Sequence, residues 1–373
     1  MAHTFLEGNE AIARGAMAAG CGFYAGYPIT PATSIYHQML RLLPPTGGVC
    51  MQGEDEIASI GFCLGASMAG AKAMTATSGP GISLYSEQIS FAIGGEIPLV
   101  IVDVQRLGPS TGSATKGADG DIQFLRWGNS GGLPVIVLAP VDVQDCYLLT
   151  IHAFNLAETY RCPVFIASNK EIATTRESVD LEGLMTPAVV QRKPCPTDHS
   201  GRSFEPLTGE LVPPFLPIGG NRLSRQTSST HGPDGYITAD PGVIQEGIWR
   251  MKEKLHSTVG DYTFFDLDIG SDDADILLIV YGVTSRAAQT AVVELRERGY
   301  KISLLILKTL YPVPQTLIRR ALQGKKQITV FEMNHGQYVR EIERLADSVP
   351  VRFYGQMNGE LISPKTIVKE VTA

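Results

Sequence analysis

The chain has 373 residues, of which 44% are hydrophobic and 18% charged, and its 31 basic and 38 acidic residues give a formal net charge of −7. This length suffices for two or three domains with buried cores, which excludes a peptide or a disulfide scaffold. An average soluble domain has about 25% charged residues, so the low charge indicates that other subunits cover part of the surface. The acidic balance argues against binding to nucleic acid.

The six cysteines lie far apart, at positions 21, 50, 63, 146, 162 and 195, and the sequence has no CxxC pair. We therefore expect this chain to hold no metal, neither an iron–sulfur cluster nor zinc. The first residues lack the basic and apolar regions of a signal peptide, and no run of 18 apolar residues occurs. We expect a cytoplasmic protein with reduced thiols and no membrane contact.

Residues 1–190 predict one α/β domain. Short β-branched runs at 73–77, 99–104, 135–139 and 164–167 are typical of buried parallel strands. Between the last two strands, residues 142–159 show helical periodicity, with Asp142 placed as the N-cap. This order of strands and helices favours a parallel sheet covered by helices on both faces.

Residues 191–272 form a predicted connecting segment. Eight prolines and seven glycines fall between residues 194 and 242, a composition that breaks regular structure. Phe204, Phe215, Leu216 and Tyr236 are interspersed among them. We therefore expect the segment to lie ordered against a neighbouring surface rather than to form a free linker.

Residues 273–373 predict a second, smaller α/β domain. Apolar runs at 276–280, 302–307 and 328–332 predict strands, and residues 285–299, 314–323 and 336–347 predict the helices between them. The same packing argument predicts a second parallel sheet with both faces covered.

Residues 26–31, Gly-Tyr-Pro-Ile-Thr-Pro, form the first candidate site segment. Pro28 and Pro31 fix the backbone around Ile29 and Thr30, and a helix is predicted to begin near Thr33. The turn would hold the Thr30 hydroxyl rigidly. Taken alone, the same pattern is also typical of a helix-capping turn.

Residues 52–58 begin a helix with three acidic residues, after which the sequence becomes small and apolar. Carboxylates at a helix start favour its positive end, which could account for Glu54, Asp55 and Glu56 without any catalytic role. Glu56 nevertheless borders the apolar part of the helix. A buried carboxylate needs a partner or a raised pKa.

Two further loops follow predicted strands. Residues 75–81, Thr-Ala-Thr-Ser-Gly-Pro-Gly, allow the backbone to approach a ligand at the carboxyl edge of the sheet, although the glycines could also mark only a tight turn. Residues 105–116 supply Arg106, Thr111 and Lys116 at the same edge. Arginine suits a planar carboxylate, whereas Lys116 is equally consistent with a solvated surface.

The segments GYPITP, GEDEIA, TATSGPG and QRLGPSTG, in this order, resemble the α subunit of the 2-oxoacid:ferredoxin oxidoreductases, especially the 2-oxoglutarate group. Residues 7–11, 307–314 and 332–337 also resemble that family, so the resemblance covers nearly the whole chain. It implies the pyrimidine-binding domain of a thiamine diphosphate enzyme, followed by a domain like the C-terminal domain of transketolase.

The resemblance also assigns residues to the cofactor. It implies that Glu56, rather than Glu54, hydrogen-bonds N1′ of the aminopyrimidine ring, because the spacing to the following glycines counts back to Glu56. Pro28 and Ile29 are expected to contact the same cofactor. A carboxyl group at N1′ promotes the tautomer whose 4′ nitrogen takes the proton from the thiazolium carbon C2.

The substrate side is assigned in the same way. The resemblance implies that Thr30 contacts the 2-oxoacid and that Arg106 binds its carboxylate, with Thr111 and Lys116 as further candidates. Leu107 stands where the family has a glycine, which leaves the shape of this loop open.

The implied reaction converts a 2-oxoacid and coenzyme A to acyl-CoA, CO2 and reduced ferredoxin, or the reverse. Thiamine enzymes bind Mg2+ and diphosphate through a Gly-Asp-Gly motif followed by asparagine, which residues 117–121 imitate only superficially. We therefore expect a β subunit to carry diphosphate, Mg2+ and a 4Fe–4S cluster. The γ part would be separate or absent, and a ferredoxin-like δ subunit is possible.

Other interpretations are the pyrimidine-binding subunit of a lipoamide-dependent oxoacid dehydrogenase, against which GYPITP and QRLGPSTG count, and a non-catalytic α/β assembly subunit. The presence of Glu56, Thr30 and Arg106 disfavours the latter. Among substrates we favour 2-oxoglutarate, with branched-chain 2-oxoacids next and pyruvate as a further alternative.

Overall fold

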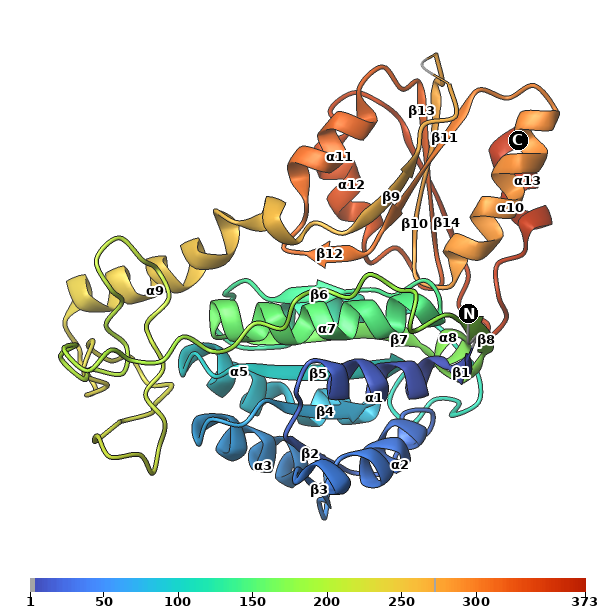
Figure 1. Cartoon of the computed structure of the whole chain (residues 1–373). Coiled ribbons are helices and arrows are strands. Elements are labelled where there is room, and N and C mark those ends of the chain that lie inside the picture. Colours follow the sequence, from blue (N-terminus) through green and yellow to red (C-terminus); the bar gives the residue numbers. More distant parts are fainter. Residues whose placement is uncertain (1–3, 272) are drawn as a thin grey trace.

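The computed structural model describes residues 4–271 and 273–373. Residues 1–3 of the predicted first domain and residue 272 of the predicted connecting segment lie outside the described residues. Two α/β units stand one against the other (Figure 1). The first contains a seven-stranded sheet. Its strands, in spatial order, are β12 (Thr309–Tyr311), β6 (Ile136–Leu138), β7 (Pro163–Asn169), β5 (Leu99–Gln105), β4 (Ala73–Thr77), β2 (Phe23–Gly26) and β3 (Val49–Gln52).

Helices cover both faces of this sheet, which explains why every residue of β5 and β7 is buried. One face packs against α1 (Gly8–Ala18), α2 (Thr33–Leu42) and α7 (Val143–Tyr160), and the other against α3 (Glu56–Met68) and α5 (Ser86–Gly94). The predicted helix 142–159 is confirmed as α7, and the Asp142 carboxylate caps it by accepting a 2.7 Å hydrogen bond from the Asp145 backbone N–H.

Short elements complete the first unit. They are β1 (Thr4–Glu7), which pairs antiparallel with β8 (Arg176–Val179), a 3-10 turn at Pro44–Thr46, α4 (Pro80–Leu84), α6 (Ile122–Trp127) and α8 (Lys170–Thr174). Among the described residues, no helix combines the length and apolar character needed to cross a bilayer.

The second unit contains a five-stranded sheet. Its strands, in spatial order, are β14 (Val351–Gly355), β13 (Gln327–Glu332), β10 (Ile276–Tyr281), β11 (Ile302–Leu307) and β9 (Phe265–Asp268). On one face lie α10 (Thr284–Glu297) and α13 (Pro364–Thr372), and on the other α11 (Gln315–Leu322) and α12 (Val339–Leu345) (Figure 1).

The expectation of two purely parallel sheets is wrong at two edges. β9 runs antiparallel to β11, and β12 runs antiparallel to β6 although it follows β11 directly in the chain. β12 therefore joins the sheet of the first unit to the second unit. The Lys308 ammonium, between β11 and β12, pairs with Asp145 at 3.0 Å and with Asp266 at 2.9 Å, which fastens this junction.

The connecting segment has no helix until α9 (Pro241–His256), which a 3-10 turn at Val259–Tyr262 follows. The expected burial of its apolar residues is confirmed for Phe204, Phe215 and Leu216. Tyr236 is instead 60% exposed, and the guanidinium of Arg225 stacks 3.9 Å from its ring centre.

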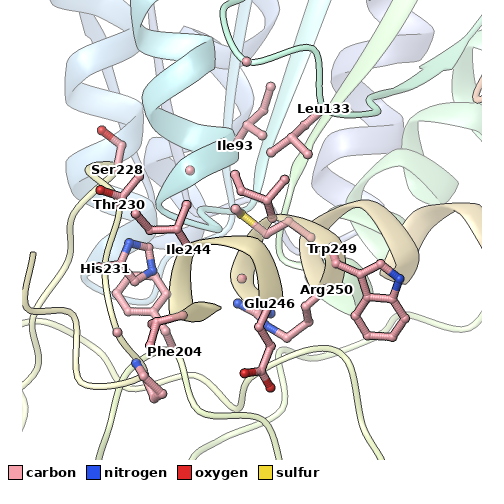
Figure 2. Close-up of a pocket in the computed structure, with 18 of the residues that line it drawn as sticks. Ile93, Leu133, Phe204, Ser228, Thr230, His231, Ile244, Glu246, Trp249 and Arg250 are labelled. Atoms are coloured by element: carbon pink, nitrogen blue, oxygen red, sulfur yellow. The ribbon is translucent and has the colours of Figure 1, made fainter. Parts of the chain in front are cut away.

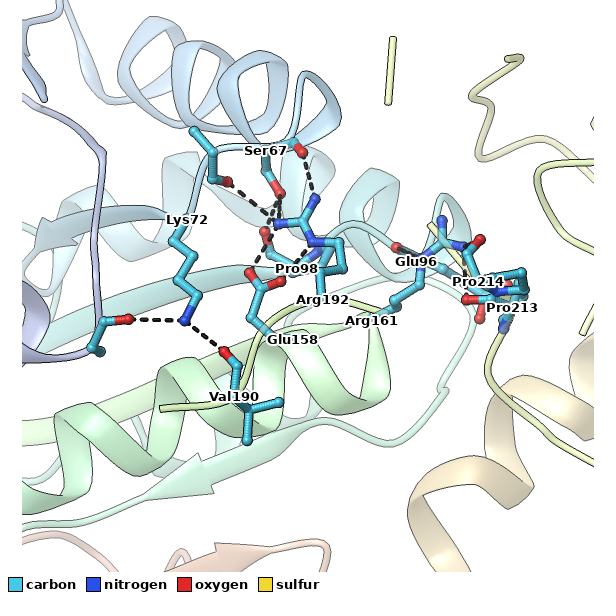
Figure 3. Close-up of polar contacts among 12 residues, drawn as sticks. Ser67, Lys72, Glu96, Pro98, Glu158, Arg161, Val190, Arg192, Pro213 and Pro214 are labelled. Atoms are coloured by element: carbon cyan, nitrogen blue, oxygen red, sulfur yellow. Dashed lines mark hydrogen bonds and ion pairs between the residues drawn. The ribbon is translucent and has the colours of Figure 1, made fainter. Parts of the chain in front are cut away.

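Buried cations hold this segment against the amino edge of the first sheet (Figure 3). Arg161 donates hydrogen bonds to the carbonyls of Ser203, Pro213 and Pro214, each at 3.2 Å, and Lys72 donates at 2.6 Å to the carbonyl of Val190, the residue just before the segment. These donors satisfy main-chain oxygens that a segment without regular structure leaves unpaired. These contacts add to hydrogen bonds within the segment, such as those from the Phe215 N–H to the Lys193 carbonyl and from the Phe204 N–H to the Pro233 carbonyl.

Candidate functional site

The four candidate segments meet at the carboxyl edge of the first sheet. Residues 26–31, 52–58 and 105–116 begin at the last residue of β2, β3 and β5, and residues 75–81 run from the end of β4 into the turn after it. Because β3, β2, β4 and β5 are neighbours and parallel, their carboxyl ends open on one side. This is the edge where open α/β sheets bind ligands.

Glu56 is the first residue of α3, and its side chain is buried, whereas Glu54 and Asp55 are exposed. Asp55 acts as the N-cap, because its carboxylate accepts a 2.7 Å hydrogen bond from the Ala58 backbone N–H. The three acidic residues therefore have different surroundings. This difference supports the choice of Glu56 over Glu54 as the cofactor residue.

The Glu56 carboxyl group lies against the turn that follows β4. A Cβ atom placed on Gly81 would stand 2.9 Å from Glu56 Oε1 and 2.0 Å from Thr77 Oγ1, so only glycine fits there. Thr77 Oγ1 and Ser78 Oγ are buried and find no hydrogen-bond partner among the described residues. Unpaired buried hydroxyls beside a carboxyl group form a polar surface suited to a ligand.

Arg106 directly follows β5 and is buried. Its guanidinium donates through Nη1 to the Thr30 carbonyl at 2.5 Å and through Nη2 to the Thr111 carbonyl at 2.8 Å. The structure thus brings Arg106, Thr30 and Thr111 together. A guanidinium has five N–H donors, so these two bonds leave donors for a ligand, and Nε is buried without a partner among the described residues.

Lys116 does not join that cluster. It is exposed, and its side chain lies against Gly359 of the second unit, where an added Cβ would stand 2.8 Å from Lys116 Cβ. Leu107 closes the loop as a bridge, because its N–H donates to the Lys116 carbonyl and its carbonyl accepts from Ser113, both at 2.8 Å. Leucine in place of glycine is therefore compatible with an ordered loop.

One residue of this site was not predicted. Asn9, in α1, is fully buried and donates through Nδ2 to the Pro31 carbonyl at 2.8 Å and to Ser34 Oγ at 2.7 Å. It fixes the turn that carries Pro28, Ile29 and Thr30. The signal was its place within residues 7–11, which the family resemblance had already marked.

Residues 117–121 do not face outward as a diphosphate motif would. Asp119 is buried and accepts a 3.1 Å hydrogen bond from Asn169 Nδ2, and burial raises the pKa of Asp119 to about 7. Among the described residues, no three histidine, cysteine, aspartate or glutamate side chains are arranged to hold a metal ion.

The second unit clamps this loop through residues 332–337. Asn334 Nδ2 donates to the Asp119 carbonyl at 2.8 Å, Gln337 Nε2 donates to the Gly120 carbonyl at 2.5 Å, and Gln337 Oε1 accepts from the Gln123 backbone N–H at 2.8 Å. The second unit therefore fixes a loop that borders the candidate site.

A pocket of about 520 Å3 lies elsewhere, between α5, the connecting segment and α9 (Figure 2). Ile93, Leu133 and Ile244 give it apolar walls, and Trp249 lies at its rim. Since α5 ends there before β5 begins, the pocket is at the amino edge of the sheet, opposite the four candidate segments.

Residues 14–248 match the family model described as pyruvate flavodoxin/ferredoxin oxidoreductase, thiamine diphosphate-binding, and residues 274–367 match pyruvate:ferredoxin oxidoreductase core domain II. The chain belongs to this family. The predicted resemblance to its 2-oxoacid members and the predicted α/β fold class, with a thiamine-diphosphate-binding domain first, are confirmed.

Two relatives are similar over nearly their full length. The chain is 39% identical to the 2-oxoglutarate synthase subunit KorA of Methanothermobacter marburgensis over 98% of both chains. It is 34% identical to the ketoisovalerate oxidoreductase subunit VorB of the same organism, over 100% of this chain and 97% of VorB. Both names describe the relatives as subunits.

A solved structure shows the same fold. The chain superposes with a TM-score of 0.93 and 33% identity on the 2-oxoglutarate:ferredoxin oxidoreductase of Magnetococcus marinus, whose structure has 2-oxoglutarate, coenzyme A and succinyl-CoA bound. The superposition covers 99% of this chain and 65% of that one.

Proposed function

We propose that the chain is the α subunit of a thiamine-diphosphate-dependent enzyme that oxidatively decarboxylates 2-oxoglutarate. The products would be succinyl-CoA, CO2 and reduced ferredoxin, and the reverse carboxylation is equally available to such an enzyme. The observation that carries the proposal is the similarity, over 98% of both chains, to a 2-oxoglutarate synthase subunit.

The residues at the carboxyl edge fit the pyrimidine half of thiamine diphosphate. The Glu56 carboxyl group and the unpaired hydroxyls of Thr77 and Ser78, which pack closely against Gly81, together form a small polar surface. Bound thiamine diphosphate supplies the carbanion and the electron sink that decarboxylation of a 2-oxoacid needs. Glu56 would hold a proton at the ring nitrogen N1′ and so act as the general acid–base group of the chain.

Arg106 and Thr30 would bind the substrate. Contacts with the carbonyls of Thr30 and Thr111 fix the guanidinium plane, so its remaining N–H donors are preorganised for a carboxylate. The exposed Thr30 lies beside this guanidinium and can offer its hydroxyl to the 2-oxoacid. Thr111 orients Arg106 through its main chain, and Lys116 is the more distant candidate.

Diphosphate, Mg2+ and the 4Fe–4S clusters would belong to partner subunits. The segment most like a diphosphate motif, residues 117–121, is bound instead by Asn169, Asn334 and Gln337 of this chain. A β subunit would complete the cofactor site, and γ and ferredoxin-like δ subunits and ferredoxin would complete the electron path.

The test is the substrate preference of the purified complex. Initial rates of viologen reduction in the presence of coenzyme A give kcat/KM for each 2-oxoacid. This kcat/KM should be highest for 2-oxoglutarate and much lower for pyruvate and 2-oxoisovalerate. The similarity to VorB makes branched-chain 2-oxoacids the second candidate. A higher kcat/KM for 2-oxoisovalerate than for 2-oxoglutarate would show that the substrate is a branched-chain 2-oxoacid. A complex without any 2-oxoacid activity would refute the proposed function.

A further inference from the structure

Two successive carbonyls of the turn after β2 are held by different elements. The Thr30 carbonyl accepts from Arg106 Nη1 at 2.5 Å, and the Pro31 carbonyl accepts from Asn9 Nδ2 at 2.8 Å. Arg106 follows β5, whereas Asn9 is the second residue of α1 and is fully buried. The turn therefore connects the Asn9 amide with the guanidinium that is proposed to bind the substrate.

The contacts of Asn9 permit one orientation of its amide. Nδ2 has two protons, and it donates one to the Pro31 carbonyl and the other, at 2.7 Å, to Ser34 Oγ in the first turn of α2. The reversed amide would place Oδ1 against the Pro31 carbonyl, so that two acceptors would face each other without a proton. Asn9 thus holds the end of the turn and the start of α2 with the two protons of one group.

This orientation leaves the other end of the amide unpaired. Asn9 Oδ1 is buried and accepts no hydrogen bond from the described residues. The loss of stability from a buried unpaired acceptor is comparable to the gain from about one or two hydrogen bonds, so Asn9 adds little net stability. Asn155, in α7, is different, because its Nδ2 donates to the Ala188 carbonyl and its Oδ1 accepts from the Val190 N–H, both at 2.8 Å. Asn9 therefore holds the turn in place without stabilising the fold as Asn155 does.

The position of the turn passes directly to Arg106. The Thr30 carbonyl and the Pro31 ring nitrogen belong to one planar peptide unit, so a shift of Pro31 carries the Thr30 carbonyl with it. That carbonyl is one of two that fix the guanidinium plane, and the other is the carbonyl of Thr111. A turn released at Pro31 would therefore leave the N–H donors of Arg106 less well aimed at a carboxylate.

We propose that Asn9 is a positioning residue for the substrate, because from α1 it holds the Thr30–Pro31 turn in the place where the turn anchors Arg106. This inference rests on the proposed function. The two hydrogen bonds of Asn9 end on the turn and on α2, whereas Glu56 is at the start of α3. Asn9 therefore acts on binding of the 2-oxoacid and leaves proton transfer at the cofactor unchanged.

The test compares Asn9→Ala with Asn155→Ala in the assembled complex. In Asn9→Ala, KM for 2-oxoglutarate should rise on the order of tenfold while kcat changes much less, as expected when the lost hydrogen bonds act on binding. Its unfolding temperature should stay close to that of the wild type, because the unpaired acceptor is removed together with the donors. Asn155→Ala should show the reverse, a lower unfolding temperature and an unchanged KM. An unchanged KM in Asn9→Ala, an equal rise of KM in Asn155→Ala, or an equal fall of the unfolding temperature in both variants would overturn the proposal.

Hydrogen exchange gives a readout that does not depend on turnover. The backbone amides of residues 27–35 should exchange faster in Asn9→Ala than in the wild-type complex, and at the wild-type rate in Asn155→Ala. If Asn9→Ala does not assemble, Asn9→Ser replaces it, since serine keeps one hydroxyl donor and should raise KM in the same direction by a smaller factor. If the wild type has no 2-oxoacid activity, the proposed function fails, and hydrogen exchange alone decides whether Asn9 holds the turn. Equal exchange in the wild type and Asn9→Ala would refute that role.

Discussion

At the scale of single residues, burial separates groups that the sequence leaves equivalent. Glu54, Asp55 and Glu56 are consecutive acids, yet one is exposed, one caps α3, and only Glu56 is buried beside Gly81. Helix geometry causes this, because the N-cap must turn its carboxylate back to the free N–H groups while the next residue enters the helix. A shift of one residue, from Asp55 to Glu56, therefore decides whether the carboxylate caps the helix or lies buried beside Gly81.

Replacing Glu56 by Gln should slow proton transfer at the cofactor more than it affects folding. The amide has nearly the same volume and can still hydrogen-bond, but it cannot exchange a proton with N1′, and such contributions are commonly about 10²- to 10⁴-fold. Exchange of the C2 proton of bound thiamine diphosphate with deuterium, followed by NMR after acid quench, should slow by a comparable factor. Glu54→Gln should exchange like the wild type. Slower exchange in Glu54→Gln alone would show that the assignment is shifted along the helix.

Replacing Arg106 by Lys should impair substrate use with cofactor content unchanged. A lysine ammonium cannot donate to the carbonyls of Thr30 and Thr111 with the fixed fork of a guanidinium, and it lacks the planar contact to a carboxylate. We expect kcat/KM for 2-oxoglutarate to fall about 10- to 100-fold. Arg126→Lys is the control, because Arg126 also donates to two main-chain carbonyls, those of Leu133 and Gly132. An equal loss in both variants would point to folding rather than to the substrate.

The sequence could indicate a site residue only where that residue stands in a short, recognisable motif. Thr30, Glu56 and Arg106 stand in short motifs and were proposed from the resemblance. Asn9 stands in α1, 22 residues before the Pro31 carbonyl that it binds, so its contact with the turn depends on the tertiary fold.

At the scale of elements, α9 and the segment before it are fastened by one buried carboxylate. Glu96 is fully buried and accepts from Lys254 at 2.7 Å and from both terminal nitrogens of Arg250. Burial by itself raises the pKa of Glu96, but the charges of Lys254 and Arg250 outweigh it and lower this pKa well below its usual range. These ion pairs thus hold α9 at the amino edge of the first sheet, although α9 is far from the strands of that sheet in sequence.

Replacing Glu96 by Gln should therefore destabilise the fold. Removal of one partner from a buried ion pair costs about 3 to 5 kcal/mol, because the cations stay buried without compensation. The pKa of Glu96 is lowered by folding, so its contribution is complete above the unfolded pKa of about 4.3 and is lost as the pH falls toward the folded value. Urea unfolding at several pH values should show this acid loss in the wild type and not in Glu96→Gln. Equal stabilities at neutral pH would contradict the argument.

The longer elements were predictable, and the edge strands were not. The periodicity of residues 142–159 and the apolar run at 73–77 gave α7 and β4 almost to the residue. β12 has three residues and pairs with a strand more than 160 positions earlier, and β9 is four exposed residues. Such short strands form because they pair with an edge strand of a sheet, and the sequence of the short strand alone does not predict that pairing.

At the scale of the whole molecule, the second unit acts on the site through the loop 117–123. Asn334 and Gln337 bind the main chain of that loop, and the backbone N–H of Asp121 in the loop donates to Oε1 of Gln105, the residue before Arg106. β12 adds a second connection, since it places a strand from the second half of the chain in the sheet of the first. The two units therefore form one framework around Arg106, the residue proposed to bind the substrate, whereas Glu56, proposed to contact the cofactor, lies farther along that sheet edge, after β3.

Gln337→Ala should loosen the loop and weaken substrate binding while leaving cofactor chemistry intact. The change removes the donor to the Gly120 carbonyl and the acceptor of the Gln123 N–H, each worth about 1 kcal/mol. We expect KM for 2-oxoglutarate to rise several-fold in the assembled complex, with the C2 exchange rate of thiamine diphosphate unchanged, because Glu56 follows β3 whereas this loop follows β5, three strands away in the sheet. Gln356→Ala is the control, since the Gln356 amide donates to the Glu360 carbonyl within the second unit. A wild-type KM in Gln337→Ala, or the same rise in Gln356→Ala, would show that the clamp does not reach Arg106.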